Sequence, residues 1–246
     1  MGTLHKLAMS AAITSALGLI SSSAFAGTAA PYLPTWDAWL SVNSSGDLIS
    51  TPITNNNGSN DFSVEGNQTL AGFSVDWNLM MNPDPYIDGF ITITNLSSSA
   101  QNFTVNLSLP VTPAFAPGLM GGSIDATVYD LNGNGSATLQ PQGSTSNPIY
   151  FGRIDGANTT LVMFAQVLSC AGVNCSANSS ESQMPAYIPV AGVNTSIGTR
   201  LQFNLSGNDR VTFATHFEVL PVPVPASAWL MGSAIIGLVG ARRRHK

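Results

Sequence analysis

Apolar and polar residues alternate in short runs along most of this chain. From Phe73 to Met80, and again from Phe103 to Leu109, every second residue is apolar and the residues between are mostly polar. The same alternation returns in Leu201 to Leu205 and in Val211 to Val219. A period of two places successive side chains on opposite faces of a strand, so each run predicts a half-buried β-strand.

About ten such strands, separated by turn residues, predict a single all-β domain of the β-sandwich or jelly-roll type. No stretch of ten or more residues between the two ends has a convincing helical period. We expect Gly89 to Thr94 to pair with the strand at Phe103, and Leu201 to Leu205 to form a final hairpin with Val211 to Val219. The pattern predicts a further strand at Thr160 to Leu168, and loops at Pro110 to Gly122 and Ser169 to Pro185.

Residues 1–26 have the pattern of a secretory signal peptide. A weakly basic start is followed by an apolar stretch from Leu7 to Ile20, and Ala24, Phe25 and Ala26 then form a small-x-small site before Gly27. The alternative is a transmembrane helix. Export would leave residues 27–221 as the body of the protein.

The last 25 residues, 222–246, form a tail with three parts. A Pro-rich connector is followed by an apolar run over residues 226–241 and a basic tip over residues 242–246. As a helix the apolar run of about 16 residues would measure roughly 24 Å, against about 30 Å for a hydrocarbon core. Trp229 suits a membrane interface, and the basic tip suits the cytoplasmic side. We predict a marginal transmembrane helix; a permanent tail anchor and a buried terminal helix are the alternatives.

This tail resembles the PEP-CTERM sorting domain of Gram-negative bacteria, with the central Pro-Glu-Pro replaced by Pro223-Val224-Pro225. The resemblance implies export through the inner membrane, processing there by an exosortase, and a final place at the cell surface or in the extracellular matrix. It also implies a biofilm setting with exopolysaccharide as a partner. The matching residues are Val222, Pro223, Val224, Pro225, Ala226, Trp229, Leu230, Gly237, Leu238, Arg242, Arg243 and Arg244.

The charge of the body disfavours polyanionic partners. Five of the eight basic residues lie in the two ends and all 13 acidic residues lie between them, so residues 27–221 carry a net charge of −10. Nucleic acid and anionic lipid surfaces would be repelled. The polar surface must instead come mainly from Asn, Ser, Thr and Gly, which suits a hydrated polysaccharide environment.

Cys170 and Cys175 are the only cysteines. In an exported protein a pair this close is expected to form a local disulfide that clamps a loop. A metal site would need further ligands, and none lies nearby in the sequence.

A candidate calcium loop begins at Asp130. Asp130, Asn132 and Asn134 supply side-chain oxygens at alternate positions, and Ser136 can add its carbonyl. Pro141 stands where a calcium loop closes with a bidentate glutamate. A tight Asn-Gly hairpin turn explains the same residues without a metal. We therefore expect no cofactor, with calcium as the alternative.

Groups for catalysis are sparse. His216 is the only histidine of the body, and it shares the outward face of its strand with Glu218, so a catalytic triad has little support. Asp76, Asp84 and Asp88 lie at one strand end and its loop and could pair for glycan hydrolysis, although ordinary turn and surface positions account for them better. We predict a non-enzymatic structural or interaction protein and assign no catalytic residue.

Trp39 is the aromatic residue most suited to stack on a sugar ring, because alternation places Trp77, and also Trp36, with the core. The alternative function is therefore a secreted carbohydrate-binding module, or a weak glycan hydrolase that uses paired aspartates.

Overall fold

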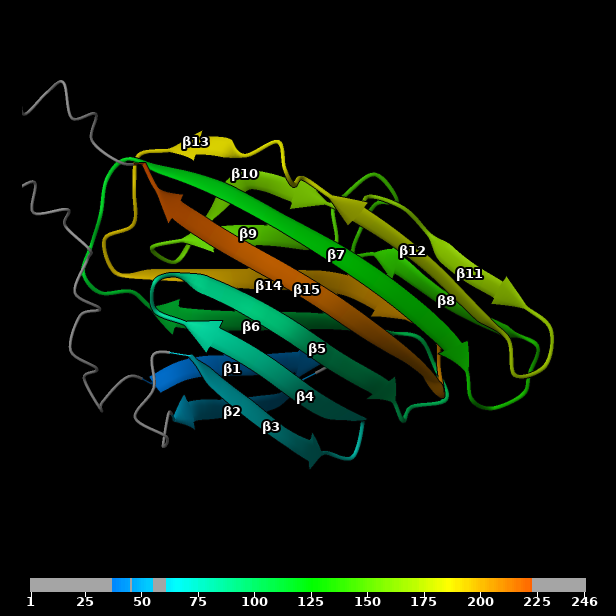
Figure 1. Cartoon of the computed structure of the whole chain (residues 1–246). Helices are drawn as coiled ribbons and strands as arrows, with labels where there is room; N and C mark the ends of the chain where they lie inside the picture. The colour runs from blue at the N-terminus through cyan, green and yellow to red at the C-terminus, as the bar shows by residue number, and fades with distance from the viewer. Residues whose placement is uncertain (1–36, 45, 55–60, 223–246) are drawn as a thin grey trace, which may run out of the picture. The chain divides into compact units, whose positions relative to one another are not determined.

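The computed structural model describes residues 37–44, 46–54 and 61–222 (Figure 1). The predicted signal peptide, Trp36 and residues 223–246 of the tail lie outside these ranges. Within them, no helix has the length and apolar character needed to cross a membrane.

The described chain forms fifteen β-strands in two antiparallel sheets, and no helix occurs in these ranges (Figure 1). The first sheet has eight strands, in the order β10-β9-β14-β6-β1-β2, with β8 beside β14 and β11 beside β8. Its strands are β1 (Asp37–Ser44), β2 (Asp47–Thr54), β6 (Gln101–Pro110), β8 (Ser136–Pro141), β9 (Tyr150–Ile154), β10 (Ala157–Met163), β11 (Leu168–Ala171) and β14 (Ser196–Leu205).

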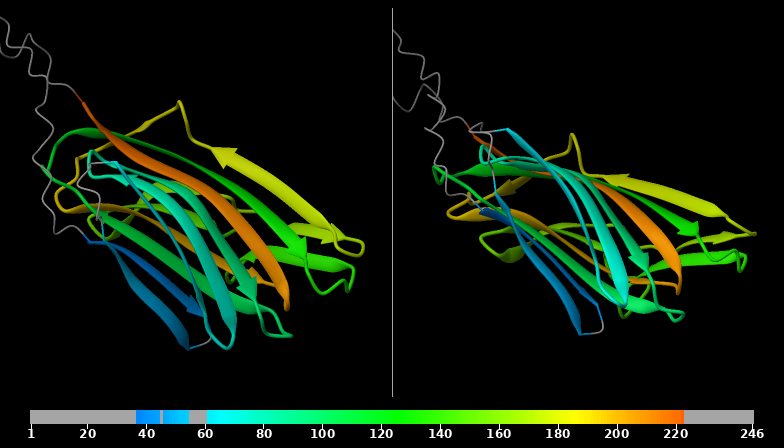
Figure 2. Two further views of the ribbon diagram at one scale, coloured as in Figure 1. Left: turned by 60° about the horizontal axis from the view of Figure 1, so that its bottom comes forward. Right: turned by 90° about the horizontal axis from the view of Figure 1, so that it is seen from below.

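The second sheet has seven strands, in the order β12-β7-β15-β5-β4-β3, with β13 also beside β7. Figure 2 shows the two sheets as stacked layers, which is the arrangement of a β-sandwich. The strands of the second sheet are β3 (Phe62–Thr69), β4 (Phe73–Asn82), β5 (Tyr86–Asn95), β7 (Gly118–Asp130), β12 (Ser176–Ser182), β13 (Ile188–Val190) and β15 (Asp209–Pro221).

The core lies between the sheets and is built from the apolar positions of the alternating strands. Four phenylalanines form a chain through it. Phe73 of the second sheet meets Phe103 of the first at 5.6 Å between ring centroids, Phe103 meets Phe203 at 5.4 Å, and Phe203 meets Phe213 of the second sheet at 5.0 Å. All four rings are fully buried, so aromatic contacts join the two layers.

The expected pairing of the last two strands is wrong, although both strands are present. β14 lies in the first sheet beside β6 and β9, whereas β15 lies in the second sheet between β7 and β5. The segment from Ser206 to Asn208 therefore crosses from one sheet to the other. An alternating strand can bury its apolar face against a strand in the opposite sheet, and the pattern does not distinguish this from a hairpin.

The same error affects the strand at Gly89 to Thr94. It belongs to β5, which pairs with β4 and β15, while the strand at Phe103 is β6, which pairs with β1 and β14. Again two strands that are consecutive along the chain lie in different layers.

Three further expectations need correction. β7 begins at Gly118, inside the predicted loop. Gly122 of that strand lies so close to β15 that a Cβ there would be 2.9 Å from the carbonyl oxygen of His216. The predicted strand to Leu168 ends at Met163, because Phe164 takes a φ of 66° and turns the chain. The predicted loop at Ser169 to Pro185 contains most of β11 and all of β12, a polar edge strand without apolar alternation.

Candidate functional site

Residues 130–136 form the turn between β7 and β8. Gly133 and Gly135 have φ angles of 67° and 88°, in the left-handed region that glycine tolerates best. The side-chain oxygen of Asn132 accepts a hydrogen bond from the backbone N–H of Asn134 at 2.8 Å, and that of Asn134 accepts one from the N–H of Ser136 at 2.9 Å. Local turns of Asn side chains thus hold the loop in shape.

The carboxylate of Asp130 sits at the centre of this loop and is 3% exposed. Its Oδ1 accepts from the N–H of Gly133 at 2.9 Å. Its Oδ2 accepts from Gly135 at 3.1 Å and from Asn174 at 3.2 Å. The four residues predicted for calcium are therefore part of one loop organised around Asp130, a geometry that both a tight turn and a calcium loop require.

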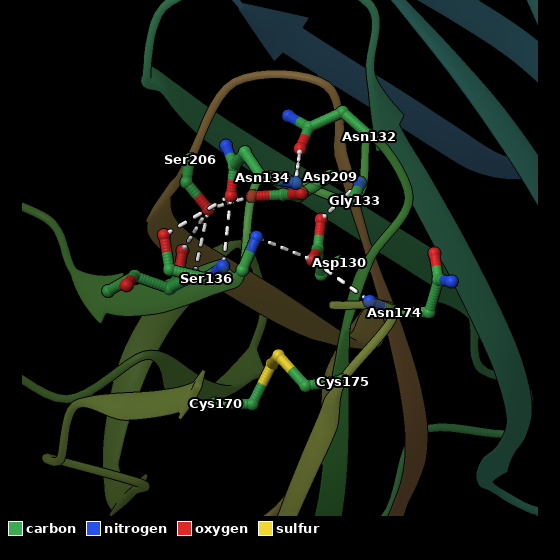
Figure 3. The surroundings of a disulfide bond; sticks show 12 residues. Asp130, Asn132, Gly133, Asn134, Ser136, Cys170, Asn174, Cys175, Ser206 and Asp209 are labelled. Atoms are coloured by element: carbon green, nitrogen blue, oxygen red, sulfur yellow. Dashed lines mark hydrogen bonds between the residues drawn. A yellow bond between two sulfur atoms is a disulfide. The ribbon is translucent and has the colours of Figure 1, made fainter. Parts of the chain in front are cut away.

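A disulfide between Cys170 and Cys175 closes the neighbouring loop (Figure 3). That loop lies directly against the Asp130 turn: Gly172 N–H donates to Gly135 O at 2.9 Å, and Asp130 N–H donates to Cys175 O at 3.0 Å. With the Asn174 contact, these bonds dock the two loops on each other. The disulfide thus limits the freedom of a segment that supplies a donor to Asp130.

Asp209 belongs to this site, although its sequence neighbourhood did not single it out. It is the first residue of β15, is 0% exposed, and stands directly opposite Asp130 in the β15–β7 register. The hydroxyl of Ser206 donates to its Oδ2, whereas its Oδ1 is buried and has no partner with hydrogen-bond geometry. The alternation of the strand does indicate its position: Asp209 has the same parity as Val211 and Phe213 and therefore points inward.

The environment of Asp209 disfavours its charge. Burial raises the pKa of its carboxyl group. The hydrogen bond from Ser206 and the approach of the backbone N–H of Leu131 oppose this shift, and the negative charge of Asp130 adds to it. At one end of the sandwich, two buried carboxyl groups therefore lie close enough for their negative charges to repel each other.

His216 lies on the outer face of the second sheet, as alternation predicted. Its side chain is 24% exposed, with Nδ1 4.0 Å from Asp88 Oδ2 and Nε2 3.8 Å from Glu218 Oε1. Ser123 stands opposite His216 on β7, but no hydrogen bond joins their side chains in the described structure. The distances from His216 to both carboxylates are also longer than a hydrogen bond. Ser123, His216, Asp88 and Glu218 therefore do not form a proton relay. Glu218 instead accepts from the hydroxyl of Tyr187 at 2.6 Å.

Two of the three aspartates considered for hydrolysis, Asp76 and Asp88, lie far apart. Asp76 pairs with Thr92 across β4 and β5, whereas Asp88 pairs with Met80, four residues further along the same strands. At about 3.3 Å per residue this separates them by roughly 13 Å, more than glycosidase carboxylates require. Asp84 lies in the turn that joins the two strands.

Trp39 lies on the outer face of the first sheet with 45% of its surface exposed. Its cross-strand neighbours are Pro52 on β2 and Ser108 on β6. One row along, Asn106 donates to Ser41 at 3.4 Å and accepts from Arg153 at 3.4 Å. An accessible indole beside amide and hydroxyl groups can contact a sugar. The core position predicted for Trp77 is realised in part, since its ring is half-buried against the core.

An open hollow of about 510 Å³ lies near β10 and β12. Its lining includes one carboxylate, that of Glu181, which accepts a hydrogen bond from the N–H of Phe164 at 2.6 Å. Phe164 is fully buried, so its ring is not free to stack on a ligand. The hollow does not offer the carboxylate pair and exposed aromatic ring that the hydrolase alternative needs.

Comparison with known proteins adds no assignment: no protein-family model matches the chain, and no curated protein matches it at a significant level.

Proposed function

We propose that this chain is an exported, non-enzymatic β-sandwich protein of structural or interaction type that reaches the cell surface or extracellular matrix through its tail. An exosortase of the inner membrane processes the tail within residues 222–246, and a signal peptidase removes residues 1–26. Exopolysaccharide is the setting in which the body then acts.

The observation that supports this proposal is where the last described strand ends. β15 is an inner strand of the second sheet, paired on both sides by β5 and β7, and it ends at Pro221. The N–H of Val222 still donates to the carbonyl oxygen of Pro117 at 3.0 Å. The sorting pattern starts at the same place in the sequence, so removal of residues 223–246 would leave both sheets with their strand pairs.

The test is intact mass and C-terminal peptide mapping of the protein from its own cells, compared with a version that lacks residues 222–246. We expect a mature chain that begins at Gly27 and ends between Pro221 and Ala226, and we expect the truncated version to be mislocalised. A mature protein that retains Lys246 would contradict processing and make the tail a permanent anchor.

A second candidate function is binding of a glycan on the outer face of the first sheet, which the exposure of Trp39 favours. We expect Trp39→Ala to weaken binding to oligosaccharides about 5- to 30-fold, since loss of a stacking contact of this kind costs about 1–2 kcal/mol. Phe90→Ala is the matched control, because Phe90 is 56% exposed on the other sheet. Equal effects of the two substitutions, or the absence of binding by the wild type, would dismiss this candidate.

A further inference from the structure

Asp130 and Asp209 present an electrostatic problem that the protein alone does not solve. They face each other across β7 and β15, at 3% and 0% exposure. Like charges directly opposite each other in a sheet are destabilising, and burial makes the cost of each charge larger. Their joint burial therefore calls for a compensating positive charge.

No basic side chain in the described ranges supplies that charge. The nearest arginine in sequence, Arg210, lies with its guanidinium over the ring of Tyr129, 4.6 Å from the ring centroid. The ion pairs found among the described residues involve His216 alone. The two carboxyl groups are thus left without a cationic partner from this part of the chain.

Asp209 also leaves an acceptor unused. Its Oδ1 is buried without a hydrogen-bond partner, and buried polar atoms of this kind are uncommon in native proteins. The approach of Leu131 N–H to the Asp209 carboxyl group places that group against the turn. Figure 3 shows the side chains of Asp130, Asn132, Asn134 and Asp209 gathered at this turn.

We propose that Asp209 completes a calcium site with the turn at residues 130–136. Asp130, Asn132 and Asn134 supply side-chain oxygens, Ser136 supplies its carbonyl, and Asp209 supplies the second carboxylate from a strand distant in sequence. Calcium fits this set because it takes six to eight oxygen ligands in flexible geometry, with water filling the remaining positions. This site does not depend on the tail or on its processing.

In the proposed site, Asp209 supplies the closing carboxylate that a calcium loop would have at the position of Pro141. Pro141 is buried in β8 and stands opposite Phe203 in the first sheet. The closing carboxylate comes instead from the start of β15, held by Ser206. A divalent ion also removes the repulsion between the two carboxylates.

Calcium titration of the protein isolated from its own cells and stripped with EGTA tests the proposal. We expect saturable binding of one Ca²⁺ per chain by calorimetry, with a Kd in the range of extracellular calcium modules, about 0.1–1 mM. The thermal midpoint should rise by roughly 5–10 °C when calcium exceeds Kd about a hundredfold. Absence of saturable binding up to about 10 mM, well above that range, would overturn the site.

Two substitutions and one control assign the ligands. Asp209→Asn should weaken calcium binding at least tenfold, and Asn134→Ala, at an exposed position, should weaken it as well. Asp76→Asn, an equivalent change at an exposed strand position, should leave Kd within twofold. If Asp209→Asn also keeps Kd within twofold, Asp209 is not a ligand and the proposal is wrong.

Stability without calcium separates a structural role from a ligand role. In EGTA, Asp209→Asn should unfold at or above the wild-type temperature, because the substitution removes a buried charge. In calcium the order should reverse. If mild acid stabilises the wild type while calcium has no effect, a proton balances the pair and the proposal fails.

Discussion

Two aspartates at opposite ends of this sandwich hold turns in place, and their surroundings shift their pKa values in opposite directions. Asp155, in the β9–β10 turn, accepts hydrogen bonds from three consecutive residues ahead of and within β14: Asn194, Thr195 at 2.7 Å, and Ser196 at 3.2 Å. Burial acts to raise its pKa, but these hydrogen bonds lower it to about 2. Asp209 has a single side-chain hydrogen bond, from Ser206, and burial raises its pKa.

The comparison shows that the number of donors, together with access to water, decides what a carboxylate does in a turn. Asp155 is exposed and surrounded by N–H groups, so its charge is stabilised and it joins the β9–β10 turn to the start of β14. Asp209 is buried opposite Asp130 with an acceptor unused, so its charge is a cost to the protein alone. The first arrangement is structural, and the second suits a cation.

The largest expected effect comes from removing the Asp155 carboxylate. Asp155→Ala should lower the free energy of unfolding by about 2–3 kcal/mol, because the N–H groups of residues 194–196 lose a charged acceptor. Denaturant unfolding measures this. Asp84→Ala, in another exposed turn, is the control and should change stability by less than about 0.5 kcal/mol.

Loss of the disulfide should loosen only the end of the sandwich that contains Asp209, and not the end that contains Asp155. Replacing Cys170 and Cys175 together by serine should cost about 2 kcal/mol, the value expected for a short closed loop. Amide hydrogen exchange should increase at Asn174 and in the turn at residues 130–136, and stay unchanged at residues 194–196. Faster exchange at both places would mean that the disulfide stabilises the whole sandwich and not this end of it.

Asp209→Asn tests whether the charge of Asp209, unlike that of Asp155, destabilises the folded protein. Without calcium it should raise the free energy of unfolding by about 1 kcal/mol, since the charge repulsion disappears while Ser206 can still donate to the amide oxygen. The measurement is the denaturant midpoint in EGTA. A loss of more than about 1 kcal/mol would show that the charged form is already stabilised by the protein.

The pH dependence should be the smallest effect, because a protonated Asp155 keeps a carbonyl oxygen that can still accept hydrogen bonds, and water screens its exposed charge. Its folded pKa of about 2 lies below its ordinary value of 3.8, so its contribution is present above pH 3.8 and is lost as pH falls toward 2. The raised pKa of Asp209 has the opposite sign: below its unfolded value it costs nothing, and it destabilises as pH rises through the folded value. In a denaturant series from pH 6 to pH 2, Asp155→Asn should therefore flatten the acid loss of stability, and Asp209→Asn should not.

Alternation in the sequence determined which side chains enter the core. The inward positions of β4, β6, β14 and β15 are those that the period of two indicates, because the pleat of a strand fixes this parity without reference to its neighbours. The close spacing of Cys170 and Cys175 likewise led to the expected local disulfide, which the structure contains. The polar edge strand β12 and the strand β3 carry weaker patterns and were not predicted.

Only the tertiary structure decided which strands pair and which groups meet. β14 and β15 are consecutive in sequence yet belong to different sheets, because burying Phe203 against Phe213 across the core satisfies the same pattern as a hairpin. Asp209 meets Asp130 for the same reason: β15 pairs with β7, a contact between residues 79 positions apart that no local spacing encodes. Local sequence fixes the face on which a residue lies, and the pairing of distant strands fixes its neighbours.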